Sequence, residues 1–122
     1  MNMKSRSELL EDRLIDFALM VNALLEKLPK TYLGHNLSSQ LTRSCTSPAL
    51  NYGEAQSASS TKDYIHKMRI SVKELRETHV GIKIIERGNL VKDKEFVISV
   101  KKESTELIAI FISSINTATK KL

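Results

Sequence analysis

Apolar residues recur every three or four positions over most of the chain, which is the spacing of a helix that buries one face. The first such segment covers residues 5–28, with apolar positions at Leu10, Leu14, Phe17, Val21, Leu24 and Leu28. Pro29 follows directly, and a residue that precedes proline is disfavoured in the α region. The pattern therefore predicts a first helix that stops before Pro29.

A second helix is predicted over residues 36–56. After a turn at Tyr32–Gly34, Asn36 or Ser38 is expected to cap it, because short polar side chains accept the free N–H groups of a first turn. Its apolar side consists of Leu37, Leu41, Cys45, Pro48, Tyr52 and Ala55. Pro48 removes one hydrogen bond to residue 44, so we expect a kink near Ser44 or a local break.

Two further helices are predicted over residues 61–87 and 92–119. Ser60 or Thr61 is expected to cap the third helix and Gly88 to follow its end. The apolar seam of the third helix is Ile65, Met68, Val72, Leu75, His79 and Ile82. The buried side of the fourth is Phe96, Val97, Val100, Leu107, Ile110, Phe111 and Ile115. Short runs in this last segment would suit strands, but a periodic pattern of this length favours a helix.

The order of these elements defines the expected fold. Short connections between long amphipathic helices place consecutive helices antiparallel, so the sequence predicts an all-α, up-down-up-down four-helix bundle. The 122 residues are expected to form one domain, 1–122.

Composition narrows the class of protein only slightly. The formal net charge of +5 favours anionic partners, although many basic proteins use lysine only for solubility. The first residues carry no apolar core of a signal peptide, and the single Cys45 suits a reducing compartment, so a cytoplasmic location is expected. No apolar run approaches a membrane span.

Catalytic and metal signatures are missing from the sequence. His35, His66, His79 and Cys45 lack the close pairing of metal ligands, and no Gly-rich phosphate loop occurs. We therefore expect no enzyme, no metal and no cofactor. His79 lies on the apolar seam and is expected to be a hydrogen-bonded core histidine.

A polar stripe follows the second helix next to its apolar side. Its members are Gln40, Arg43, Ser47, Asn51 and Glu54. Antiparallel pairing with the third helix places Glu54 near Lys62 and His66, Asn51 near Arg69, and Arg43 near Glu77. The stripe predicts a polar network of Arg43, Ser47, Asn51, Glu54 and Glu77 that fixes helix register, with a ligand site as the alternative.

Basic residues form a second stripe along the third helix, which we call the basic ladder: Lys62, His66, Arg69, Lys73, Arg76, Lys83 and Arg87. At ~100° per residue they share one arc beside the apolar seam, and a helix of this length rises ~37 Å from Lys62 to Arg87. Such a stripe can track several phosphates, and the candidate nucleic-acid-binding residues are Lys62, Arg69, Lys73, Arg76 and Lys83. The ladder contains no aromatic residue for base stacking, so backbone contact is expected. Alternatively, water or acidic faces of neighbouring subunits absorb the charge.

Two segments carry a family resemblance. LTRSCTSPALNYGEA at residues 41–55 and DYIHKMRISVKELRET at residues 63–78 resemble the "four helix bundle protein" family. Its members include proteins encoded in intervening sequences of bacterial 23S ribosomal RNA genes, and the accessory protein of diversity-generating retroelements is a relative. The motif positions are Arg43, Ser44, Ser47, Asn51, Glu54, Lys73, Glu74 and Glu77. Relatives carry larger side chains where Val80 and Gly81 stand, and Gly81 is expected to weaken the third helix by ~1 kcal/mol.

The resemblance implies a ring of bundles, typically a homopentamer, with a basic surface that contacts RNA or DNA, and it admits a protein partner such as a reverse transcriptase. The outward-facing Ile70, Ile84 and Ile85 exceed what one monomer covers, and a ring would bury them. The leading hypothesis is a non-catalytic oligomer that binds nucleic-acid backbone. The rival hypothesis is a protein-interaction scaffold with no nucleic-acid role.

Overall fold

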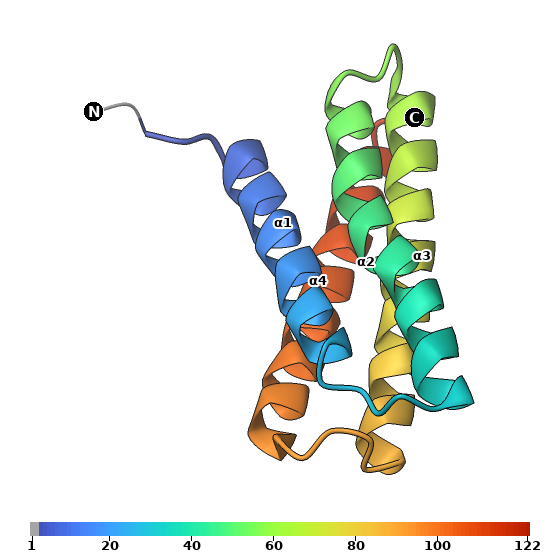
Figure 1. Cartoon of the computed structure of the whole chain (residues 1–122). Helices are drawn as coiled ribbons and strands as arrows, with labels where there is room; N and C mark the ends of the chain where they lie inside the picture. Colours follow the sequence, from blue (N-terminus) through green and yellow to red (C-terminus); the bar gives the residue numbers. More distant parts are fainter. Residues whose placement is uncertain (1–2) are drawn as a thin grey trace.

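Four antiparallel helices make up the fold (Figure 1). The structure, a computed structural model, describes residues 3–122. In chain order the helices are α1 (Arg6–Leu25), α2 (Tyr32–Gln56), α3 (Thr61–Arg87) and α4 (Lys94–Thr119). α2 packs against α3 and α3 against α4, α1 leans mainly on α2, and the contact between α1 and α4 is the smallest. The predicted all-α four-helix bundle is confirmed.

α1 begins at a capping box. The Ser5 side chain accepts from the Glu8 N–H, and the Glu8 side chain accepts in turn from the Ser5 N–H. The helix ends at Leu25, three residues before the predicted end at Leu28. The Lys27 and Leu28 N–H groups bond three residues back, to Leu24 and Leu25, so the chain tightens into a turn before Pro29.

The start of α2 corrects the prediction. The helix begins at Tyr32, and Thr31 is its N-cap, with the Thr31 hydroxyl accepting from the Gly34 N–H at 3.1 Å. Neither Asn36 nor Ser38 caps it. The chain folds back so closely that a Cβ at Gly34 would strike the Pro29 carbonyl oxygen. Glycine at this position therefore permits an early helix start instead of marking a turn.

α2 continues through Pro48 without interruption, so the predicted alternative of a local break is wrong. The Pro48 carbonyl accepts a hydrogen bond from the buried Ser71 hydroxyl of α3 at 3.2 Å. Ser71 therefore lies opposite Pro48, in agreement with the predicted antiparallel register.

α3 has its predicted bounds, with Ser60 as N-cap. At its end, Gly88 is the C-cap and has a right-handed backbone conformation. The following residue, Asn89, has the left-handed conformation, with φ 50°. The Asn89 N–H bonds to the Glu86 carbonyl and the Leu90 N–H to that of Ile85, which is a Schellman motif. α4 begins two residues later than predicted, because the Asp93 side chain caps it by accepting from the Phe96 N–H.

The core lies between the four apolar seams. Its largest fully buried side chains include Phe17, Phe111, Met68 and Leu75. Cys45 is buried too, with Sγ 3.8 Å from the Ala18 carbonyl oxygen of α1, and burial raises the pKa of its thiol to about 11.

Small residues bring α2 and α3 close together. The buried hydroxyls of Ser44 and Thr78 are 2.7 Å apart, and Gly81 is buried where a Cβ would collide with the side chain of Leu41. Gly81 is thus a helix–helix contact position. The helix stability that glycine is expected to cost is offset by the packing of Leu41, for which a larger residue would leave no space.

The exposed isoleucines differ from the prediction at one position. Ile85 is fully buried, and together with Val91 and Val97 it lines a small pocket under the loop between α3 and α4. Ile84 is 41% exposed and Ile70 is half-buried. Over residues 3–122 no helix has the length and apolar character needed to cross a bilayer.

Candidate nucleic-acid interface

The five predicted nucleic-acid-binding residues lie along one side of α3. Lys62, Arg69, Lys73 and Arg76 are exposed, and Lys83 is half-buried. The ladder position between Arg76 and Lys83 is occupied by Val80, which is 51% exposed. Within residues 3–122 none of the five cations makes an ion pair. They therefore form an uncompensated positive surface on the monomer.

The carboxylates of α3 point elsewhere. Glu74 and Glu77 both pair with Arg43 of α2, at 3.1 and 2.6 Å, and Glu86 pairs with Lys101 of α4 at 2.8 Å. The Asp63 carboxylate accepts a hydrogen bond from the Ser59 hydroxyl at 2.8 Å, and the Asp63 N–H donates to the Ser60 hydroxyl that caps the helix. The negative charges of the helix are thus used at its start and against its neighbours, which leaves the ladder side positive.

The polar stripe of α2 divides into three separate contacts rather than one network. Arg43 reaches Glu77, as the register predicts, and also Glu74. The Asn51 side chain donates to the Ser47 hydroxyl and carbonyl on its own helix, not to a group near Arg69. The ion-pair partner of Glu54 is Lys67, at 2.6 Å, instead of Lys62 or His66. This choice of Lys67 leaves Lys62 free of an intramolecular carboxylate.

His79 lies between the seam and the ladder and is half-buried. Its Nδ1 is 2.6 Å from the Ser104 hydroxyl, and that hydroxyl donates its single proton to the Lys101 carbonyl at 2.8 Å. The imidazole Nδ1–H must therefore be the donor to Ser104. Burial, and then the charges of Lys83, Lys101 and Arg76, lower the pKa of His79. His79 is consequently neutral at pH 7, as a hydrogen-bonded histidine at the edge of the core.

The other titratable groups do not gather into a metal site. In the part of the chain that the structure describes, no three His, Cys, Asp or Glu side chains come close enough to hold an ion.

Fold and surface together define a basic antiparallel four-helix bundle with cations along one side of α3. Comparison with known proteins specifies the family. The 23S rRNA-intervening sequence protein family matches residues 11–113, and the chain belongs to this family. No curated protein matches the chain.

A solved structure has the same architecture. It is the crystal structure of a protein of unknown function from the S23 ribosomal protein family of Bacteroides thetaiotaomicron. That protein is 28% identical to this chain, and the match covers 92% of this chain and 99% of that one, with a TM-score of 0.78.

Proposed function

We propose that this protein is a non-catalytic, oligomeric nucleic-acid-binding bundle whose basic ladder contacts the phosphate backbone. The observation that supports it is the segregation of charge on α3. Five cations have no ion-pair partner within residues 3–122, while Glu74, Glu77 and Glu86 of the same helix pair with other helices. A solvated helix gains nothing from stacking like charges on one side, whereas a polyanion neutralises them.

The geometry suits binding to the backbone without reading sequence. The ladder runs along an uninterrupted helix, and its side chains recur about every turn, ~5.4 Å, with one interval of two turns between Arg76 and Lys83. Lysine and arginine on such a line meet successive phosphates and release counterions, which makes affinity strongly salt-dependent. Phosphate contacts position a protein on nucleic acid but do not specify a base.

Assembly of several copies is the second part of the proposal. Large aliphatic side chains that are strongly exposed include Leu50 of α2, at 68%, and Leu19 of α1, at 63%. Both lie on the α1–α2 half of the bundle. Contacts between copies through this half would bury apolar surface and leave the ladder of α3 accessible, so that a ring presents several ladders at once.

The test is salt-dependent binding of RNA and DNA, measured by fluorescence anisotropy. We expect log affinity to fall linearly with log salt for the parent protein. The triple variant Arg69→Ala/Lys73→Ala/Arg76→Ala should bind more weakly and with a flatter slope. A matched control, Lys30→Ala/Lys92→Ala/Lys102→Ala, removes the same charge from exposed positions outside α3 and should keep the slope nearly unchanged.

Two results would contradict the proposal. Salt-independent binding, or equal slopes for the two triple variants, would remove the ladder as the interface. No affinity for nucleic acid at moderate salt would favour the protein-scaffold alternative. Light scattering that gives a mass of 13.8 kDa, and not about five times that, would overturn the pentameric assembly.

A further inference from the structure

A cleft of about 940 Å³ lies at the end of the bundle where α1 parts from the other helices. Figure 1 shows α1 leaning away from α2 and α3 at this end, which also holds the α2–α3 loop and the C-terminus. The walls come from the first half of α1, the last turns of α2 and α4 and the beginning of α3. Its volume is in the range of cavities that hold small molecules.

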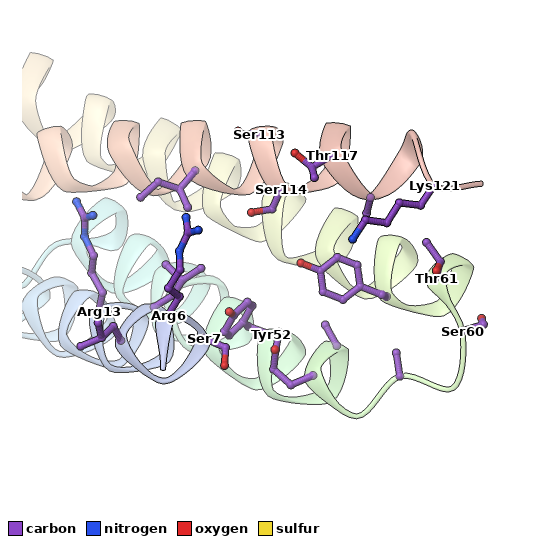
Figure 2. Close-up of a pocket in the computed structure, with 18 residues that line it drawn as sticks. Arg6, Ser7, Arg13, Tyr52, Ser60, Thr61, Ser113, Ser114, Thr117 and Lys121 are labelled. Atoms are coloured by element: carbon purple, nitrogen blue, oxygen red, sulfur yellow. The ribbon is translucent and has the colours of Figure 1, made fainter. Parts of the chain in front are cut away.

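The polar groups of the cleft suit an anion. None of the described residues that line the cleft is acidic, whereas three of them, Arg6, Arg13 and Lys121, are basic. Arg13 is held by Glu103 at 2.7 Å, but Arg6 and Lys121 make no ion pair within residues 3–122. Figure 2 shows Arg6 reaching from α1 toward α4, and Lys121, two residues after the end of α4, extending into the cleft.

The remaining lining suits a flat, partly apolar group with hydrogen-bonding edges. Leu10, Ala55 and Ile110 supply apolar surface, and serine and threonine hydroxyls of α4, including Ser114 and Thr117, lie along one wall (Figure 2). A nucleobase has this character, because its faces stack on apolar or aromatic side chains and its edges form hydrogen bonds.

Two tyrosines provide the strongest observation. Tyr52 is 4% exposed and fixed by its ring contact with Phe111, at 5.5 Å between centroids, yet its hydroxyl has no hydrogen-bond partner within residues 3–122 and lines the cleft. Tyr64 lines the same cleft from α3 and is half-buried. Burial raises the pKa of both phenols, so both are protonated donors at neutral pH. The Tyr52 ring is buried while its hydroxyl is open to the cleft, so an acceptor on a ligand can take the place of water there.

The cleft lies beside the first turn of α3, where the basic ladder begins. Thr61 and Tyr64 both line the cleft, and Lys62, the first residue of the ladder, lies between them in the sequence of α3. Lys62 does not itself line the cleft, so a nucleic-acid strand that follows the ladder has to turn around the start of α3 to reach Arg6 and Lys121.

We infer that the cleft receives one unpaired nucleotide of the bound nucleic acid, its base against Tyr64 and within reach of the Tyr52 hydroxyl, and its phosphate between Arg6 and Lys121. This inference rests on the proposed function and adds a preference that the ladder cannot supply. The preferred ligand is a duplex that carries a bulged or flipped-out nucleotide, because a fully paired base cannot enter the cleft.

The experiment compares two RNA hairpins that differ by one unpaired adenosine in the stem. The parent protein should bind the bulged hairpin on the order of tenfold more tightly, the scale expected for one stacked base. Tyr52→Phe keeps the ring beside Phe111 and removes only the hydroxyl, and Lys121→Gln removes one charge. Each should reduce the preference for the bulge severalfold while leaving affinity for the paired hairpin nearly unchanged.

Two controls separate the cleft from the ladder. Lys120→Gln removes the neighbouring exposed lysine, which does not line the cleft, and should retain the full preference. The ladder variant Arg69→Ala/Lys73→Ala/Arg76→Ala should weaken both hairpins and keep the ratio between them.

Adenosine monophosphate serves as a probe that does not need the ladder. In NMR titrations it should shift the ring resonances of Tyr64, and Tyr52→Phe should weaken its binding.

The outcomes are distinct. Equal affinity of the parent for the two hairpins, or an unaltered preference in both cleft variants, overturns the inference and leaves the proposed function standing. Binding of neither hairpin overturns the proposed function, and the inference with it.

Discussion

The two sides of the bundle are built in different ways. Between α2 and α3, helices approach closely through Gly81 and the Ser44–Thr78 hydroxyl pair, and ion pairs of Arg43 and of Lys67 cover the outside of the contact. Between α1 and α4 the contact is smaller, and its ion pairs are those of Arg13 with Glu103 and Glu106. Beyond it the helices separate into the cleft.

This difference shows how one bundle combines stability with an open site. The close packing of α2 on α3 supports the helix that carries the ladder, while the wider spacing between α1 and α4 leaves the cleft open. Regions with few buried contacts open at low free energy, so the first half of α1, which lines the cleft, is the part of the bundle expected to move most easily.

The largest difference in stability is expected when leucine is replaced by alanine in α3 and, separately, in the part of α1 that lines the cleft. Leu75→Ala in α3 removes a fully buried side chain and should cost about 3–5 kcal/mol of unfolding free energy. Leu10→Ala in α1 removes a half-buried side chain that lines the cleft and should cost about 1 kcal/mol. Urea unfolding followed by circular dichroism at one protein concentration measures both. Equal losses would show that the two sides are packed alike.

Replacing glycine by alanine should change the stability of the protein in opposite directions at two helical positions. Gly81→Ala forces Leu41 out of its place in the core and should destabilise by about 1–2 kcal/mol, although alanine is the better helix former. Gly53→Ala in α2 would meet only the Glu11 carboxylate at 3.9 Å and should stabilise by about 1 kcal/mol. Thermal unfolding of the two variants gives the sign directly, and a stabilised Gly81→Ala would contradict the close approach of α2 and α3.

A smaller effect concerns pH and the contact of α3 with α4. The pKa of His79 is lowered in the folded state from its ordinary 6.5, so the unfolded chain binds this proton more readily. Stability should be complete above pH 6.5 and fall as the pH drops below it, until the folded-state pKa is passed. His79→Gln should flatten this part of the profile in urea unfolding between pH 5 and 7.5, whereas His66→Gln, at an exposed ladder position, should keep it. An unchanged slope in His79→Gln would argue against a neutral imidazole bonded to Ser104.

The smallest effect on stability is expected at the solvent-exposed edge of the α2–α3 contact, where Arg43 lies. The Arg43 side chain is 59% exposed, so its bonds to Glu74 and Glu77 are well screened. Arg43→Gln should cost less than about 1 kcal/mol at low salt, and the cost should shrink in 1 M salt. A larger, salt-independent loss would show that the pair, and not the buried hydroxyls, holds the two helices together.

Periodicity determined most of the architecture in advance. The bounds of α3, the apolar seams and the ladder follow from side-chain spacing, which is a local property of a helix. The start of α2 was missed because Gly34 resembles a turn residue, and only its close approach to the Pro29 carbonyl reveals another role.

The side-chain partners between helices were less predictable than the apolar and basic faces of each helix. The sequence places Glu54 opposite the start of α3, but the reach of a long side chain selects Lys67 rather than Lys62. The cleft lay beyond sequence reasoning altogether, because it depends on the angle at which α1 leaves α2. Tyr52 and Tyr64 carried the available signal, as aromatic residues close to the beginning of the ladder.

Cys45 lies where the second half of α1 packs on α2, so its reactivity reports whether this contact opens. Its thiol is 2% exposed and lies against the Ala18 carbonyl, and a pKa of about 11 keeps it protonated, so it reacts with alkylating reagents only when α1 lifts away. The rate at which iodoacetamide labels this one sulfur therefore counts the opening events of the first helix, in solution and with no added probe.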